Sequence, residues 1–322
     1  MAARTLWPES SVADHPARAL EGVVRGAVHV NAPMAKRVSW RAGGAAAVLF
    51  VPADLEDLAT ALARLPAECP VQFIGLGSNL LVREGGFEGV LVLTHRVLST
   101  AEAQGEGRFC VGAGVPCAKL ARMACRLGHV DAAFFAGIPG TVGGALHQNA
   151  GAFGSETWRW VHQATLIDRS GALWKTAPSE VEVGYRQINL PRVGFFVAAE
   201  FDFGPQQTSE AGGRIRELLV QRAGAQPTGR PSCGSVFRNP DGDYAGRLIE
   251  AAGLKGLRRG DACISDKHAN FILNLGRASA TDIEWLMRRA QEVVAARFGI
   301  VLHPEVCIIG ELGPAQAQGS EQ

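Results

Sequence analysis

The chain has 322 residues, of which 47% are hydrophobic and 20% charged, a composition typical of globular proteins that excludes wholesale disorder. Its 32 basic and 31 acidic residues leave a formal net charge of +1. This balance excludes a general electrostatic attraction to nucleic acid or to an anionic membrane, so a bound anion needs a local site.

Cysteine spacing and hydropathy further limit which class of protein the chain can be. The seven cysteines form no CxxC pair and no Cys/His spacing typical of zinc, which predicts reduced thiols and no metal site. No apolar run approaches the ~20 residues that cross a bilayer. The N-terminal segment MAARTLWPESSVADHPARALEG also lacks the apolar core of a secretory signal. We therefore expect a cytoplasmic protein that binds no membrane.

The pattern of apolar residues divides the chain into a loose N-terminus at 1–20 and three units. The first unit, 21–96, is predicted to contain a helix that begins near 54 and strands at 45–52, 71–74, 80–82 and 90–93. The second, 97–204, is predicted to contain a helix at 118–128 and strands at 109–116, 164–168, 173–176, 183–186 and 193–203. Strands with few helices indicate an α+β subdomain packed against the first unit.

The third unit, 205–312, is predicted to hold helices at 209–222, 244–252 and 280–298, strands at 265–274 and 306–309, and an irregular segment at 223–230. For the helix at 280–298 we expect Thr281 as N-cap and Gly299 as the C-terminal stop. A polar tail follows at 313–322.

Two glycine-rich segments are candidates for ligand binding. GLGSN at 75–79 follows a predicted strand, and AGIPGTVGGALHQNAGAFG occupies 136–154. Dense glycine exposes backbone N–H groups that form concave nests for phosphate oxygens. The apolar residues of the longer segment argue against a flexible linker, which usually carries polar residues. The shorter segment matches neither a dinucleotide-binding fingerprint nor a Walker loop, and by itself it could be only a tight turn.

Further motifs occur in order along the chain. They are GLGSNLLV at 75–82, GIPGTVGGALHQNAGAFG at 137–154, GYR at 184–186, PSCGSVFRNP at 231–240, AGRLIEAAGLKG at 245–256, SDKHANFILN at 265–274 and HPEV at 303–306. Together they resemble the UDP-N-acetylenolpyruvoylglucosamine reductase (MurB) family from about residue 38 to 310. The short interval between GYR and PSCGSVFRNP resembles the subgroup without an extra tyrosine-bearing loop.

The resemblance implies an α+β fold and a reaction. In this family a two-part FAD-binding domain of the vanillyl-alcohol-oxidase (PCMH) type, here 21–96 and 97–204, precedes a C-terminal α+β substrate-binding domain, here 205–312. NADPH reduces FAD, and the flavin then reduces the enolpyruvyl ether of a UDP-sugar to UDP-N-acetylmuramate for peptidoglycan synthesis. A monomer that acts on a small UDP-sugar is therefore expected.

The resemblance also assigns roles to residues. Arg186 and Glu305 are placed at the substrate carboxylate, and Ser235 is placed as the proton donor; Tyr185, Arg222, Asn239 and His268 are candidates for the UDP-sugar. The implied FAD contacts are Gly75, Leu76, Gly77, Ser78, Asn79, Leu80, Gly137, Ile138, Gly140, Thr141, Gly143, Gly144, Asn149 and Gly151.

Several points stay open in the sequence. Lys267, Arg238 or a water could support Ser235, and His147 and His268 could be either structural or functional. Cys233 is interpreted as a packing residue because no activating base is predicted beside it. Two features depart from the family pattern: Ala225 stands where a basic residue is common, and Gln187 stands where a small hydroxyl residue is common. The alternative functions are a flavin oxidase and a non-catalytic FAD or UDP-sugar binding protein.

Overall fold

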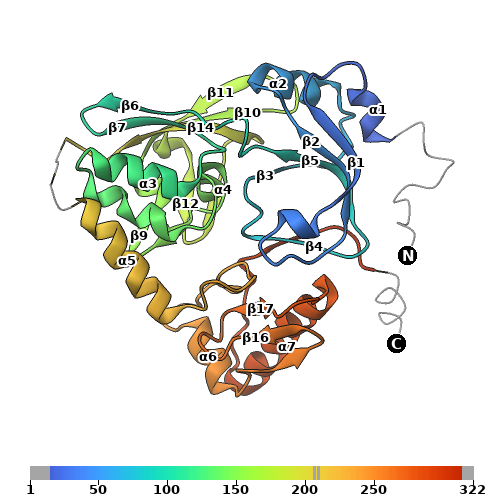
Figure 1. Ribbon diagram of the computed structural model, residues 1–322, viewed down its shortest axis with the longest axis vertical. Coiled ribbons are helices and arrows are strands. Elements are labelled where there is room, and N and C mark those ends of the chain that lie inside the picture. The colour runs from blue at the N-terminus through green and yellow to red at the C-terminus, as the bar shows by residue number, and fades with distance from the viewer. Residues whose placement is uncertain (1–14, 206–207, 209–210, 314–322) are drawn as a thin grey trace.

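The computed structural model describes residues 15–205, 208 and 211–313, and it folds them into three units that mix helices and strands (Figure 1). The α+β class expected from the sequence is confirmed. The residues of the predicted polar tail after 313 and those before 15 lie outside the described part. Among the described residues, no helix is both long and apolar enough to cross a membrane.

The first unit is built on a mixed four-stranded sheet in the order β1-β2-β5-β3. β1 is antiparallel to β2, whereas β2 and β3 run parallel to β5. Residues 46–50 of β2 are all buried, as expected for a parallel strand covered on both faces. The helices and strands are α1 (Pro16–Leu20), β1 (Ala27–Pro33), η2 (Ala35–Arg37), β2 (Ala45–Val51), α2 (Leu55–Arg64), β3 (Val71–Ile74), β4 (Leu80–Val82) and β5 (Phe87–Leu93).

One prediction for this unit is wrong in part, and the pairing of one strand was not predicted. Residues 16–20 were expected to be loose, but they form α1, because the side chain of Leu20 is fully buried in the core. β4 and β5 both form, yet β4 does not lie in the sheet of β5: it pairs in parallel with β18, far along the chain.

The second unit is an antiparallel five-stranded sheet in the order β11-β10-β14-β7-β6. Most of its buried residues share one hydrophobic cluster with residues of the first unit such as Val48, Phe50 and Leu58. Phe73 stacks on Phe195 across the junction, with ring centroids 4.3 Å apart. The two units therefore form one body. The elements are β6 (Ala101–Gly105), β7 (Arg108–Gly112), α3 (Cys117–Arg126), η3 (Val130–Gly137), α4 (Val142–His147), β8 (Gly151–Ala152), β9 (Ser155–Glu156), η4 (Thr157–Trp160), β10 (Val161–Ile167), β11 (Leu173–Thr176), η5 (Pro178–Glu180), β12 (Glu182–Gly184), β13 (Gln187–Asn189) and β14 (Phe195–Asp202).

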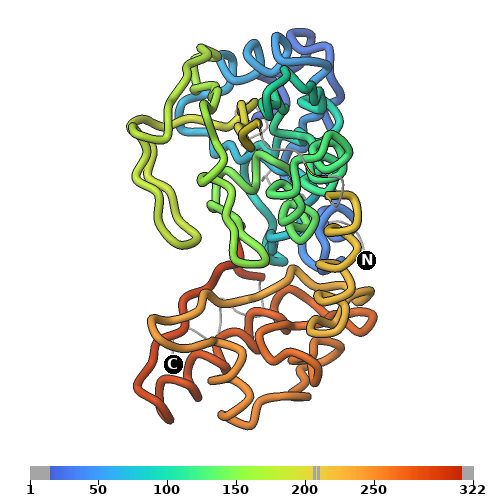
Figure 2. The backbone as a smooth tube through the Cα atoms, turned by 90° about the vertical axis from the view of Figure 1, so that its left-hand side faces the viewer, coloured from blue at the N-terminus to red at the C-terminus, as the bar shows by residue number. Residues whose placement is uncertain are grey.

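The strand predicted at 183–186 ends earlier than expected. β12 stops at Gly184, and Tyr185 and Arg186 form the two-residue turn of a hairpin with β13. Arg186, the second of the two turn residues, has a φ of 56°, a left-handed conformation of the kind that this position of a type II turn requires. In Figure 2 the yellow-green backbone of this part of the chain reaches from the second unit toward the third.

The third unit combines three helices with the small sheet β15-β16-β17. Its elements are α5 (Ala211–Ala225), α6 (Ala245–Ala251), β15 (Arg258–Arg259), β16 (Ala262–Ile264), β17 (Ile272–Asn274), α7 (Ala280–Phe298) and β18 (Cys307–Ile309). α5 runs three residues beyond the predicted end at 222, into the segment expected to be irregular.

Two further predictions for the third unit are corrected. Only the last residues of 265–274 form a strand, because the hydroxyl of Ser265 accepts the N–H groups of Lys267 and His268 and holds that part in a turn. The N-cap of α7 is Ser279 rather than Thr281, and its hydroxyl accepts the N–H of Asp282. Gly299, with φ 68°, ends α7 as predicted.

The third unit is anchored to the first by buried contacts. Trp40 of the first unit is fully buried in the core of the third. Its Nε1 donates to the carbonyl of Ile272 at 2.7 Å, and the side-chain amide of Asn274 donates to the carbonyl of Trp40 at 2.8 Å. Glu84 accepts the N–H groups of Ala280 and Thr281 at the start of α7. The first unit therefore fixes the orientation of the third.

A buried carboxylate adds to this anchor and gives a stability prediction. Glu284 on α7 accepts from Arg83 at 3.0 Å and from Arg288 at 2.7 Å. Burial by itself would raise the pKa of Glu284, but these hydrogen bonds outweigh it, so the pKa lies below its usual value of 4.5. We expect Glu284→Gln to lower the free energy of unfolding by about 1–3 kcal/mol at pH 7.

The pH dependence of that loss has a definite sign. A carboxyl whose pKa is depressed by folding adds stability above the unfolded pKa and loses it as the pH falls through the folded value. The difference between wild type and Glu284→Gln should therefore shrink below about pH 4.5 in urea titrations. Glu292→Gln, which removes an exposed pair with Arg289 on the same helix, should cost under about 0.5 kcal/mol. Equal losses in both variants would contradict the prediction.

Candidate active site

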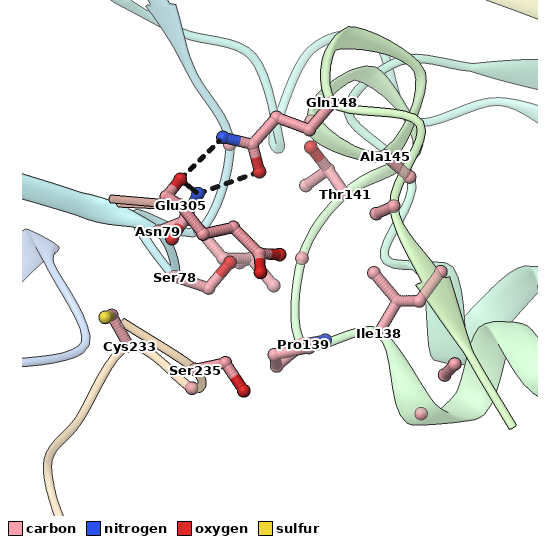
Figure 3. Close-up of a pocket in the computed structure, with 18 of the residues that line it drawn as sticks. Ser78, Asn79, Ile138, Pro139, Thr141, Ala145, Gln148, Cys233, Ser235 and Glu305 are labelled. Carbon is pink, nitrogen blue, oxygen red and sulfur yellow. Dashed lines mark hydrogen bonds between the residues drawn. The ribbon is translucent and has the colours of Figure 1, made fainter. Parts of the chain in front are cut away.

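A cavity of about 510 Å³ lies where the three units meet. The first unit contributes the turn after β3, and the second contributes the segment from η3 through β8. The third contributes the end of α5, the residues around Ser235, and Glu305 just before β18. Figure 3 shows Ser235 and Glu305 facing the loop of Ile138, Pro139 and Thr141 across this space.

The turn after β3 presents backbone donors to the cavity. Residues 75–80 all line it, and Gly77 adopts a φ of 61° that favours glycine. The N–H groups of Gly77, Ser78 and Asn79 donate to no acceptor within the described part of the chain. Unpaired N–H groups in succession form an anion-binding nest, so this turn fits the pyrophosphate of a dinucleotide.

The second glycine segment meets the first at close range. A β-carbon at Gly75 would overlap the hydroxyl of Thr141, so glycine is needed there for contact between the segments. Gly140 and Gly144 line the cavity, and a β-carbon at Gly144 would meet no atom closer than 4.0 Å. The backbone there is open to a ligand. The arrangement fits a bound flavin dinucleotide, as the sequence predicts.

Three of the predicted glycine contacts have a structural reason within the protein. A β-carbon at Gly137 would overlap the ring of Phe153, and one at Gly151 would lie 2.6 Å from the carbonyl oxygen of Ser155. Gly143 packs on Ala113 and donates its N–H to that residue's carbonyl at 2.7 Å. Gly143 does not line the cavity, and its flavin contact stays a prediction.

Three residues predicted to contact a ligand bond within the protein instead of lining the cavity, and their ligand roles stay predictions. Asn149 is fully buried; its amide donates to the carbonyl of Gly184 and accepts the N–H of Trp158. Asn239 accepts the N–H of Ala245 and so caps α6. His268 accepts the N–H of Asn270, and burial lowers its pKa. In each case the side chain forms a hydrogen bond to the protein backbone that the motif does not reveal.

Arg186 and Glu305, which the resemblance assigns to the substrate carboxylate, lie side by side at the cavity. The Nε of Arg186 lies 2.8 Å from Oε1 of Glu305, and each side chain is 18% exposed. The guanidinium also donates to the carbonyls of Asn149 and Gly151. Burial raises the pKa of Glu305, although the charge of Arg186 opposes the rise. The pair is a partly buried charge cluster at the cavity wall, a common feature of active sites.

Ser235 also lines the cavity, beside Cys233 and Gly234. Cys233 is buried, and burial raises its pKa well above the usual value, which fits its interpretation as a packing residue. Of the candidates to support Ser235, neither Lys267 nor Arg238 lines the cavity. Lys267 donates to the carbonyl of Ala223 at 2.6 Å. Arg238 is close enough for its charge to lower the pKa of Glu305, and its buried Nε has no partner in the described ranges.

The two remaining substrate candidates lie on different sides of the site. Arg222 lines the cavity from α5 and donates to the carbonyl of Gly137 at 2.9 Å and to Gln226 at 2.8 Å. Ala225, the departure from the family pattern, lines the same wall. Tyr185 is 51% exposed and borders a neighbouring hollow with Arg186. No group of three or more His, Cys, Asp or Glu side chains in the described residues could hold a metal ion.

Sequence reasoning missed one residue at the centre of the site. Gln148 lines the cavity and bonds to both Asn79 and Glu305 (Figure 3). Its position inside a recognised motif was the available signal, but its partners come from two other segments. His147, left open, also lines the cavity, and burial lowers its pKa.

A matched pair of glycines tests the fit of a flavin. Gly144→Ala should fold at least as stably as wild type, because alanine favours helix by about 1 kcal/mol and the β-carbon meets open space. The added methyl group should raise the dissociation constant of FAD by about tenfold or more, measured by quenching of flavin fluorescence. Gly143→Ala, whose β-carbon would lie 2.9 Å from that of Ala113, should instead lower the melting temperature. Unchanged FAD affinity in Gly144→Ala would place the flavin elsewhere.

Comparison with known proteins agrees with this geometry. Residues 46–177 match the model of an FAD binding domain, which spans most of the two-part body that carries both glycine segments. Residues 226–309 match the model of the UDP-N-acetylenolpyruvoylglucosamine reductase C-terminal domain. An FAD-binding domain joined to this second domain defines a flavin-dependent oxidoreductase.

Whole-chain relatives give the family. The chain is 52% identical over 279 residues to UDP-N-acetylenolpyruvoylglucosamine reductase of Alkalilimnicola ehrlichii, covering 87% of this chain and 93% of the relative. It is 48% identical over 300 residues to that of Nitrosomonas eutropha, covering 90% of each. The crystal structure of the reductase (MurB) from Thermus caldophilus superposes with a TM-score of 0.75 at 33% identity, over 89% of this chain and 99% of that one. The chain belongs to the UDP-N-acetylenolpyruvoylglucosamine reductase (MurB) family.

Proposed function

We propose that this flavoenzyme uses NADPH to reduce the enolpyruvyl ether of UDP-N-acetylenolpyruvoylglucosamine to UDP-N-acetylmuramate, with Ser235 as the proton donor. The observation that carries the proposal is the convergence of Arg186, Ser235 and Glu305. These residues come from separate segments, yet all three line the cavity that the glycine segments border. Binding of a flavin alone does not require this set.

The reaction defines what the protein must supply. FAD held by the two glycine segments would supply the hydride, taken from NADPH, that the vinyl ether receives. Negative charge then develops on the substrate carboxylate, so fixed positive charge is needed there. Arg186 meets this need, because its planar guanidinium matches a carboxylate and stays charged. Glu305 and the carbonyls of Asn149 and Gly151 hold that guanidinium in place.

Ser235 completes the proposed reaction by giving a proton to the other vinyl carbon. An alcohol is a weak acid in water, so the transfer depends on the basicity of the enolate and on charge nearby. Arg238, on the same segment as Ser235 and with its buried Nε unpaired within the described residues, is the protein group that we favour for stabilising the serine oxygen. Lys267 is not favoured because it bonds elsewhere.

For the substrate, Arg222 is the proposed partner of the diphosphate, since it lies at the cavity wall on the third-unit side. We further propose a cytoplasmic monomer. The cavity residues named above come from a single chain, and all seven cysteines are free thiols. Light scattering should give a mass near 34.0 kDa; a dimer mass would contradict the monomer.

One experiment tests the function. The purified protein is loaded with FAD, its visible spectrum is recorded, and NADPH oxidation is followed with and without UDP-N-acetylenolpyruvoylglucosamine. We expect a yellow protein whose NADPH oxidation depends on that substrate and yields UDP-N-acetylmuramate by mass spectrometry. A protein that takes up no FAD would overturn the proposal. A yellow protein that is inert to this substrate would favour a flavin oxidase or a non-catalytic binding protein.

A further inference from the structure

Gln148 sits at the junction of the two glycine segments and the third unit. Its Oε1 accepts from the side-chain amide of Asn79 at 2.7 Å, and its Nε2 donates to the backbone carbonyl of Glu305 at 3.3 Å. The amide of Asn79 donates to the same carbonyl at 2.9 Å. Figure 3 shows the three residues in contact at the cavity wall. Two amide side chains thus hold a single carbonyl.

The backbone of Glu305 is held through its N–H group as well as through this carbonyl. The N–H of Glu305 donates to the carbonyl of Val236, the residue after Ser235, at 2.8 Å. The N–H of Cys307 donates to the backbone carbonyl of Asn79 at 3.0 Å. The main chain of Glu305 is therefore held between the serine segment and the turn after β3.

The residues just after Gln148 close the arrangement into a ring. Asn149 and Gly151 accept hydrogen bonds from the guanidinium of Arg186, which pairs with the carboxylate of Glu305. The segment 148–151 is thus connected to Glu305 in two ways. Gln148 bonds to its backbone carbonyl, and Arg186, held by Asn149 and Gly151, pairs with its carboxylate. Hydrogen-bond networks of this kind stiffen a site when their members are satisfied.

We propose that Gln148, acting with Asn79, is a positioning residue that fixes Glu305, and through it Arg186, relative to Ser235. The inference rests on the proposed roles of those three residues. Catalytic groups must be held within about 0.5 Å of the productive geometry, and the position of a carboxylate depends on its own peptide. Asn79 thereby gains a role beyond the predicted flavin contact, because its side-chain amide donates to Gln148 and to the carbonyl of Glu305.

The competing interpretation is that Gln148 touches the substrate itself, since it lines the cavity. The two interpretations predict different energetic coupling between substitutions of Gln148 and of Glu305. A residue that works only through Glu305 loses its effect when Glu305 has already been neutralised, whereas a direct contact does not. Gln148→Met keeps the length of the side chain and removes both hydrogen bonds.

The test is a double-mutant cycle of Gln148→Met and Glu305→Gln. We expect Gln148→Met alone to slow oxidation of the reduced flavin by the UDP-sugar by about 10- to 50-fold. Flavin reduction by NADPH and the dissociation constant of FAD should stay within about threefold. In the Glu305→Gln background, the same substitution should cost less than about twofold. Additive losses, or a loss of FAD affinity equal to the loss of rate, would overturn the proposal.

A second readout needs no turnover, so it stays valid even if the proposed function fails. The carboxyl of Glu305 is titrated by carbon NMR in labelled protein, with its signal identified by its absence in Glu305→Gln. Because the charge of Arg186 lowers the pKa of Glu305, a loosened pair in Gln148→Met should raise that pKa further. Gln221→Met, the same change elsewhere on the cavity wall, should leave it unchanged. An unchanged pKa in Gln148→Met would refute the positioning role.

Discussion

Replacing Ser235 by alanine is expected to slow transfer to the enolpyruvyl substrate by about 10²–10⁴-fold while NADPH still reduces the flavin at nearly the wild-type rate. This is the range in which a positioned proton donor contributes. The two half-reactions should be affected differently because Ser235 lies on the third-unit side of the cavity. The glycine segments proposed to bind the flavin belong to the other two units. Stopped-flow absorbance near 450 nm separates the half-reactions, with enzyme reduced by NADPH and then mixed with substrate.

Ser232→Ala is the matched control, because the same hydroxyl is removed three residues earlier and Ser232 does not line this cavity. It should leave both half-reactions within about twofold. Equal slowing of both half-reactions in Ser235→Ala would show that the serine acts on the flavin or on folding, and that the proton comes from another group.

Substitution of Arg186 by lysine is expected to produce the second largest loss, a fall of about 10²–10³-fold in kcat/KM. Lysine keeps the positive charge but lacks the planar fork. It could not bond the carbonyls of Asn149 and Gly151 and pair with Glu305 in the way that the guanidinium does. The loss should fall mainly on the second half-reaction, because the developing enolate carries the charge that Arg186 stabilises.

Folding should be little affected by this change. Arg186 already occupies the left-handed region at φ 56°, and lysine bears the same backbone cost as arginine there. The visible spectrum and melting temperature of Arg186→Lys should therefore match wild type. Arg192→Lys, which alters an arginine stacked on Trp174 outside the cavity, is the control. Full activity of Arg186→Lys would mean that charge alone suffices and that the fork geometry has no role.

The fold was most predictable where local signals act alone. β3 and β11 match their predicted bounds, and α7 matches at both ends, because alternating or helical apolar patterns and a stop at Gly299 are written into adjacent residues. Prediction failed where contacts between residues far apart in the sequence determine the structure. Leu20 orders α1 only because a core is present to bury it, and β4 pairs with β18 through a contact that no local pattern encodes.

The candidate site also has features that the sequence predicts and features that only the structure shows. Arg186, Ser235 and Glu305 were singled out through the family resemblance, and all three line the same cavity. Asn149, Asn239 and His268 also occur in motifs that carry the resemblance, yet their side chains bond within the protein. A motif shows that a residue type is needed at a position, but not whether a ligand or a neighbouring backbone needs it.

The sequence by itself determined the family, the α+β class and the glycine segments for a flavin. These depend on residue identities and on backbone freedom that glycine alone provides, and both are properties of short stretches of chain. Only the tertiary structure decided that Trp40 is buried in the core of another unit, and that Gln148 and Asn79 share the carbonyl of Glu305. Such contacts join segments more than 60 residues apart, and their partners are chosen by how the units pack, which no single segment specifies.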